Sequence, residues 1–229
     1  MGTCGVSETG YMLLTHITLD IPRRGRMSGT SVTERIREQA REMAEGEILS
    51  AKALLHLGSR ASVDQALSRL AREGVLVRVG RGHYSPVVRS AFGERAPRHE
   101  LFVWHWAEHT GETVTPSGLQ EARAFGLTTQ VPVRAVYLTS GRTRRLRAGA
   151  VEVEMRHAPP WLLHGSGSPV GKAIRALEWM GAEHAPAAIA KIRALLPAEE
   201  VNSLLAARPL MPLWLAQAVS SLATVEQRA

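Results

Sequence analysis

Apolar residues recur at helical spacing after residue 30. Four of them fall on one helix face, separated by four, four and three positions: Val32, Ile36, Ala40 and Met43. Ser31 stands just before this stripe and Glu34 lies three positions further on, which is the capping-box pattern of a helix start. We therefore expect a helix that begins at Val32 and ends before Gly46.

Two further helices are expected on either side of Gly58. Ser50 would cap the first, at residues 51–57, and Ser59 the second, which runs to about residue 73 and ends at Gly74. The second helix has one apolar face: Val63, Ala66, Leu67, Leu70 and Ala71. Its opposite face is polar: Ser62, Asp64, Gln65, Ser68, Arg69 and Arg72.

Residues 75–86 have the pattern of a β-hairpin. An apolar, largely β-branched run at residues 75–79 leads into the turn Gly80-Arg81-Gly82, and residues 83–86 form the return strand. Two helices joined by a tight glycine turn and followed by a hairpin are typical of a winged helix-turn-helix, whose second helix reads DNA. We expect such a DNA-binding domain at residues 31–90.

The side chains expected to contact DNA lie on the polar face of that helix and on the hairpin: Arg60, Ser62, Gln65, Ser68, Arg69, Arg72, Arg78, Arg81 and His83. Ser62, Gln65 and Arg69 would lie nearest the bases, because Gln and Arg match the hydrogen-bonding edges of adenine and guanine. The other arginines would contact the backbone or the minor groove. Two alternatives stay open: the polar face is only solvated, or the winged helix binds a protein.

A second domain is expected at residues 97–229, after a linker at residues 88–98. It would begin with a helix at residues 99–110 and contain strands at residues 133–139 and 151–155. Helical patterns follow at residues 171–179, 186–196, 198–206 and 213–222. The expected fold class is α+β, a winged helix-turn-helix followed by a mixed α/β domain with a helical C-terminal tail. Residues 1–30 are expected to be a disordered extension, and whether the natural start is Met1 or Met27 stays open.

Four arginines lie between the two expected strands: Arg142, Arg144, Arg145 and Arg147. They could form a second patch that contacts phosphates, since each phosphate contact releases counterions and strengthens binding. They could equally well form a solvated hairpin. The sequence leaves both interpretations open.

Composition changes this picture little. The net charge of +7 favours polyanionic partners, but residues 31–95 hold 11 basic against 8 acidic residues. Cys4 is the single cysteine, so no intramolecular disulfide can form and a cytoplasmic setting is expected. There is no run of 18 apolar residues, so no membrane partner is expected.

The sequence contains no catalytic constellation. The only enzyme-like pattern is His-Trp-Ala-Glu-His at residues 105–109, which has the spacing of a zinc-protease motif but no evident third ligand. We therefore expect no enzymatic activity, no cofactor and no metal site.

Several stretches together resemble the AbiEi-type antitoxins of type IV toxin–antitoxin systems: residues 57–70 (LGSRASVDQALSRL), 73–74 (EG), 80–84 (GRGHY), 116–118 (PSG), 126–132 (GLTTQVP), 136–139 (VYLT) and 156–159 (RHAP). The resemblance spans about residues 30–220. It implies a cytoplasmic antitoxin that binds the operator of its own operon, represses it and counters a nucleotidyltransferase-like toxin, directly or indirectly. The alternatives are a winged-helix module for protein–protein interaction and a general transcriptional regulator without a toxin partner.

Overall fold

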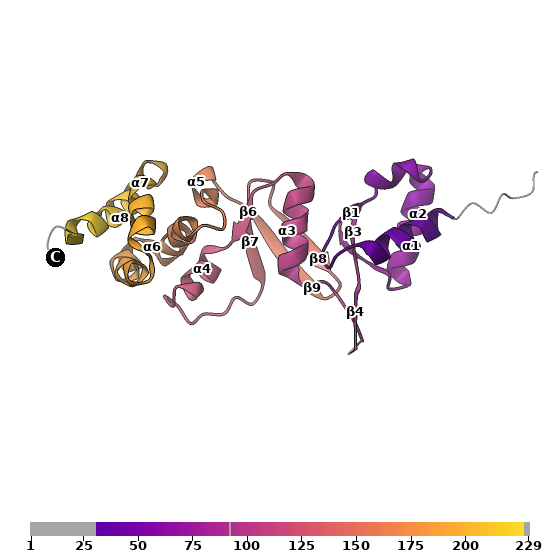
Figure 1. Ribbon diagram of the computed structural model, residues 1–229, viewed down its shortest axis with the longest axis horizontal. Coiled ribbons are helices and arrows are strands. Elements are labelled where there is room, and N and C mark those ends of the chain that lie inside the picture. The colour runs from indigo at the N-terminus through magenta and orange to yellow at the C-terminus, as the bar shows by residue number, and fades with distance from the viewer. Residues whose placement is uncertain (1–30, 92, 227–229) are drawn as a thin grey trace, which may run out of the picture. The chain divides into compact units, whose positions relative to one another are not determined.

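The described part of the chain combines helices with three separate antiparallel or mixed sheets, so the expected α+β class with a helical C-terminal region is confirmed (Figure 1). The structure, a computed structural model, describes residues 31–91 and 93–226. The extension predicted for residues 1–30 lies outside the described residues. No helix in the described part of the chain has the length and apolar character needed to cross a membrane.

Hydroxyl side chains start two of the first helices where the sequence predicts. The helices are α1 (Val32–Glu42), the 3₁₀ helix η1 (Ala53–His56) and α2 (Arg60–Arg72). Ser31, Ser50 and Ser59 each accept a hydrogen bond from the backbone N–H three residues further on, at 3.2, 3.1 and 3.3 Å. The helix expected at residues 51–57 is a shorter 3₁₀ helix whose N-cap residue is Lys52, without a side-chain cap, so the prediction that Ser50 caps it is wrong.

A three-stranded antiparallel sheet closes the first core. Its strands are β1 (Leu49–Ser50), β2 (Leu76–Gly80) and β3 (His83–Pro86), in the order β1-β3-β2. The turn between β2 and β3 contains Arg81 and Gly82, as predicted for the hairpin. Most residues of the predicted apolar stripes are buried in this core, whereas Val32, Met43 and Ala71 are only partly buried at its edge. The buried residues are Ile36, Ala40, Leu49, Ala51, Leu54, Val63, Ala66, Leu67, Leu70, Leu76 and Tyr84.

The segment predicted to be a linker contains a second hairpin. β4 (Val88–Ser90) pairs antiparallel with β5 (Gly93–Arg95). Arg95 then forms an ion pair with Glu45 at 2.8 Å, and the same carboxylate accepts the backbone N–H of Arg98 at 2.9 Å. These contacts tie the segment to the loop after α1.

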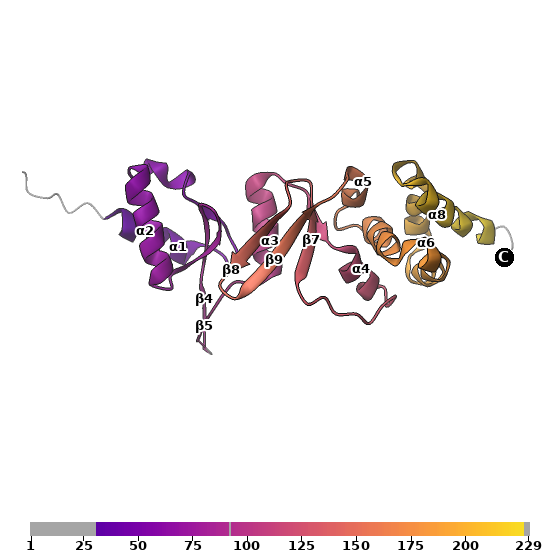
Figure 2. The same ribbon diagram turned by 180° about the vertical axis from the view of Figure 1, so that it is seen from behind.

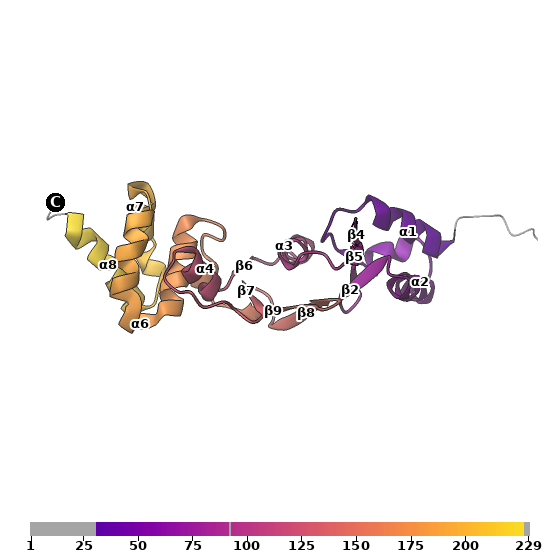
Figure 3. The same cartoon turned by 90° about the horizontal axis from the view of Figure 1, so that it is seen from below.

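A four-stranded sheet forms the middle of the described chain (Figure 2). It comprises β6 (Val114–Pro116), β7 (Ala135–Thr139), β8 (Arg144–Ala148) and β9 (Val151–His157), in the order β6-β7-β9-β8. β7 and β9 are parallel, and the other pairs are antiparallel. α3 (His99–Thr110) covers one face of this sheet, so that Phe102, Val103 and Trp106 pack into its core (Figure 3).

The hairpin of the first sheet also joins this second core. Leu76 at the start of β2 is buried with α1 and α2, whereas Val79 near its end is buried with α3 and the four-stranded sheet. β2 therefore lies against β8. A Cβ atom on Gly80 would stand 3.2 Å from the ring of Trp106, so a larger residue there would require the ring to shift by a few tenths of an ångström.

Helices form the C-terminal part: α4 (Gly118–Ala124), α5 (Pro160–Leu163), α6 (Pro169–Leu195), α7 (Ala198–Ala206), η2 (Arg208–Leu210) and α8 (Leu213–Glu226). Gly181, at φ 75° and ψ 170°, interrupts α6 and separates the two helices predicted there. Alanine, leucine and isoleucine side chains of α6 pack with α7 and α8 in a third core.

A buried ion pair fastens α4 to α6. The guanidinium of Arg175 is fully buried and donates to the Glu121 carboxylate at 3.0 Å and to the Leu162 carbonyl at 3.3 Å. Burial lowers the pKa of Arg175, and the hydrogen bond to Glu121 partly offsets that effect. Arg175 thereby links α4, α5 and α6 through one side chain.

Removing only one partner of this pair should be costly. We expect Glu121→Leu to lower the free energy of unfolding by about 3–5 kcal/mol, because it leaves a buried cation without its counter-charge. The double variant Glu121→Leu/Arg175→Met should recover most of that loss in urea unfolding. Glu154→Leu, which breaks the partly exposed pair with Arg156, is the matched control and should change stability much less. A double variant as unstable as Glu121→Leu would contradict this account.

Candidate nucleic-acid interface

The outer face of α2 is polar and exposed. Asp64 is exposed on this face, among the side chains that are expected to contact DNA: Arg60, Ser62, Gln65, Ser68, Arg69 and Arg72, which are all exposed to solvent. Most of them line a hollow of about 610 Å³, to which Val32 and Thr33 of α1 also contribute. The predicted face is therefore one continuous surface along the helix.

Two of these residues have partners and four do not. Arg60 forms an ion pair with Asp64 at 2.9 Å, and the Ser62 hydroxyl lies 2.9 Å from the hydroxyl of the capping residue Ser59. Within the described ranges, no hydrogen bond or ion pair engages the remaining side chains: Gln65, Ser68, Arg69 and Arg72. Their donors and acceptors are free to bind another molecule.

A second hollow brings the hairpin and the predicted arginine run together. It measures about 580 Å³, and four guanidinium side chains line it: Arg78, Arg81, Arg145 and Arg147. Arg78 and Arg147 each donate to a backbone carbonyl nearby, of Gly80 at 3.2 Å and of Gly149 at 3.1 Å. Ala71 of α2 also lines this hollow, so the hollow borders the helix that carries the first surface.

The alternation of β8 divides the arginine run. Arg145 and Arg147 point to solvent, whereas Arg144 shares the other face with the buried Leu146. Arg144 forms an ion pair with Glu112 at 2.7 Å, and its Cζ lies 5.6 Å from the centre of the Trp106 ring. Arg142 lies in the turn before β8 and is outside the second hollow. The structure thus brings only Arg145 and Arg147 to the hairpin arginines.

His83 does not line the hollow of the four arginines. Its ring packs against Trp106 and His109 of α3, with centroid distances of 4.7 and 5.3 Å, and its Nδ1 is 2.8 Å from the Arg81 carbonyl. This position suits a side chain that holds the hairpin on α3. Sequence reasoning missed that role, because no local pattern in the sequence links His83 to Trp106 and His109 of α3.

The residues of the zinc-protease spacing are engaged with other groups. His105 Nδ1 lies 3.1 Å from the Glu108 carboxylate on the same helix, while His109 stacks edge-on with His83. In the part of the chain that the structure describes, no three side chains of His, Cys, Asp or Glu gather where they could hold a metal ion.

A protein-family model matches most of the chain. Residues 35–204 match the family model described as a family of unknown function, DUF6088. The chain belongs to this family. No curated protein matches this DUF6088 chain.

Among solved structures, this DUF6088 chain is similar to the crystal structure of the RV2827C protein from Mycobacterium tuberculosis. The two share 17% sequence identity with a TM-score of 0.45, over 83% of this chain and 75% of the other. At that level the likeness carries no argument about function.

The histidine pair should make stability depend on pH. Burial lowers the pKa of His109 below its ordinary 6.5, and the neighbouring His83 lowers it further. At His109 the unfolded chain therefore binds a proton more readily than the folded chain does. The contribution of a neutral His109 to the free energy of unfolding is fully present above pH 6.5 and is lost as the pH falls below 6.5. When the pH is lowered from 7.5 to 5, we expect the melting temperature of His109→Gln to fall by less than that of the native chain. His184→Gln, on an exposed part of α6, serves as the control and should behave like the native chain. If the melting temperatures of the native and His109→Gln chains fall in parallel with pH, the assignment of this pH dependence to His109 is wrong.

Proposed function

We propose that this DUF6088 chain binds double-stranded DNA, with residues 31–90 acting as a winged helix-turn-helix and α2 as the reading helix. The observation that carries the proposal is the outer face of α2, where Gln65, Ser68, Arg69 and Arg72 are exposed and without partners beside the hollow of four arginines.

The side chains of the two hollows suit different parts of DNA, base edges at α2 and phosphates at the hairpin and β8. The major groove admits an α-helix, and there Arg pairs with guanine and Gln with adenine through two hydrogen bonds each. Gln65 and Arg69 lie one helical turn apart on α2, so both can face the same base edges. The arginines of the hairpin and of β8 suit phosphates, which position a protein without reading sequence.

We further propose that the DNA is the operator of the chain's own operon, and that the chain is a cytoplasmic autorepressor and antitoxin rather than an enzyme. The resemblance of its sequence to AbiEi-type antitoxins supports this step. The partner would then be a nucleotidyltransferase-like toxin, and a reading frame of that type beside this gene is the observation that separates an antitoxin from a regulator without a toxin.

Single substitutions on α2 should change sequence preference. We expect Gln65→Ala and Arg69→Ala each to cost about 1–3 kcal/mol on the operator and to relax specificity at one position. Arg81→Ala should weaken operator and random DNA alike, because it would remove a phosphate contact. Fluorescence anisotropy with both DNAs measures this difference.

Arg123→Ala, on an exposed position of α4, is the control and should leave both affinities unchanged. Equal losses on operator and random DNA for all three interface variants would contradict the assignment of α2 as the reading helix. Binding only at low salt and without sequence preference would favour the alternative of a protein-interaction module.

The arginines of β8 should contribute to the salt dependence of binding. Replacing Arg145 and Arg147 by alanine should reduce the slope of log K against log salt concentration by about one per arginine, since each phosphate contact releases counterions. Arg142→Ala removes one positive charge from the neighbouring turn and should leave the slope as it is. A native slope in the Arg145→Ala/Arg147→Ala variant would exclude β8 from the DNA surface.

A further inference from the structure

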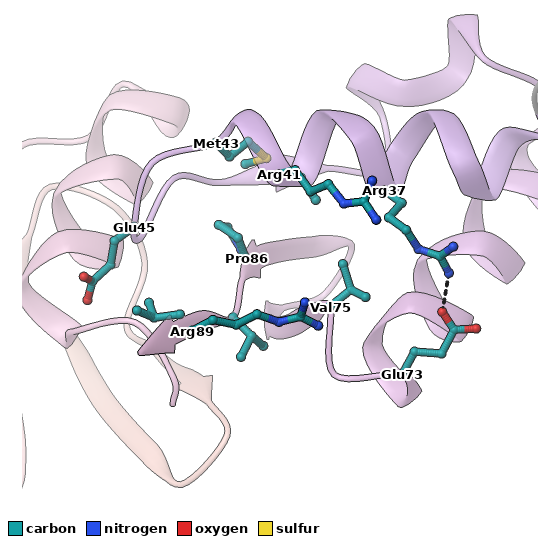
Figure 4. A pocket seen from close by; sticks show the side chains of 11 residues that line it. Arg37, Arg41, Met43, Glu45, Glu73, Val75, Pro86 and Arg89 are labelled. Atoms are coloured by element: carbon teal, nitrogen blue, oxygen red, sulfur yellow. Dashed lines mark hydrogen bonds and ion pairs between the residues drawn. The ribbon is translucent and has the colours of Figure 1, made fainter. Parts of the chain in front are cut away.

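A third pocket borders α1 at residues other than those that line the hollow along α2 (Figure 4). It measures about 560 Å³ and lies between α1, the residues that follow α2, and the segment from β3 to β4. Ligand pockets for small molecules have volumes of roughly 300–1,000 Å³, so this one has the size of a small-molecule site. It shares no lining residue with the two hollows of the proposed DNA surface.

Both acidic residues at this pocket are already paired. Glu73 accepts a hydrogen bond from Arg37, and Glu45 is engaged by Arg95 at 2.8 Å and by Arg98. Arg37 is also bound to Glu34 at 2.8 Å, so its charge is compensated. The carboxylates around the pocket therefore leave little negative charge to repel an anion.

Two arginines at the pocket, Arg41 and Arg89, are available to attract an anion. Within the described ranges, the side chain of Arg41 forms no ion pair or hydrogen bond. Arg89 pairs with Glu94 at 3.1 Å, but both side chains are more than half exposed, and exposed pairs of this kind contribute little free energy. In Figure 4 the two guanidinium groups extend in the same direction from opposite walls, Arg41 from α1 and Arg89 from β4.

Between these two arginines the walls are apolar. The side chains there are aliphatic or a thioether: Ala40, Met43, Val75, Pro86, Val87 and Val88. Ala40 and Pro86 are buried, and the others are partly buried. Apolar walls with a few polar or charged groups are typical of sites for small organic ligands.

We infer that this pocket binds a small organic anion with an apolar body, of the class of aromatic carboxylates. Arg41 and Arg89 hold the carboxylate, because guanidinium groups match its geometry with two parallel hydrogen bonds. The valine and proline side chains cover the apolar body. This inference stands apart from DNA binding, so either can fail without the other.

Titration calorimetry with benzoate tests the inference on the full chain. Benzoate should bind with a stoichiometry of one, and the Arg41→Ala/Arg89→Ala variant should bind it at least tenfold more weakly. Arg35→Ala removes an exposed arginine of α1 that does not line the pocket, and it should bind as the native chain does. Benzyl alcohol lacks the charge and inorganic phosphate lacks the apolar body, so both should bind more weakly than benzoate.

Three results would overturn the inference: no benzoate binding by the native chain, equal binding by the double variant, or an equal loss in Arg35→Ala. Thermal unfolding must show that the double variant is folded. Because Arg41 and Arg89 are both exposed, replacing them by alanine should not unfold the chain. Should the double variant be unfolded, the charge reversal Arg41→Glu supplies the same comparison, with weaker binding expected and unchanged binding contradicting the site.

Discussion

The contact between the β2–β3 hairpin and α3 fixes the geometry of the whole candidate DNA surface. Gly80 lies against Trp106, Val79 enters the core of the four-stranded sheet, and His83 packs on the same helix. Because one strand, β2, contributes to two cores, the hairpin has a set position relative to β8. Without that contact, Arg78 and Arg81 would have no defined relation to Arg145 and Arg147.

Local signals in the sequence were sufficient for α1 and α2. A serine hydroxyl that accepts a backbone N–H marks the starts of α1 and α2, and Gly74, at φ 73°, marks the end of α2. Such interactions span three or four residues, so a sequence pattern contains all of their partners. The exposed face of α2 followed from the same helical period, and the structure places its residues as that period requires.

Long-range contacts were beyond the reach of such patterns. The arginine-rich β8 has few of the β-branched residues that mark a strand, and its pairing with β9 depends on residues further along the chain. Only that strand geometry separates Arg145 and Arg147 from Arg144, whose partner Glu112 lies 32 positions away in the sequence. Likewise, nothing local to Arg175 shows that Glu121 will lie beside it in a buried site.

α1 borders both the hollow along α2 and the pocket that faces β4. Its first residues, Val32 and Thr33, border the hollow along α2, whereas Arg37 and Arg41, further along the helix, border the pocket that faces β4. Arg37 also pairs with Glu73 just after α2, so it ties α1 to the end of the helix proposed to read DNA. An anion at Arg41 and Arg89 would therefore bind to the helix that supports α2, through residues that the DNA surface itself does not use.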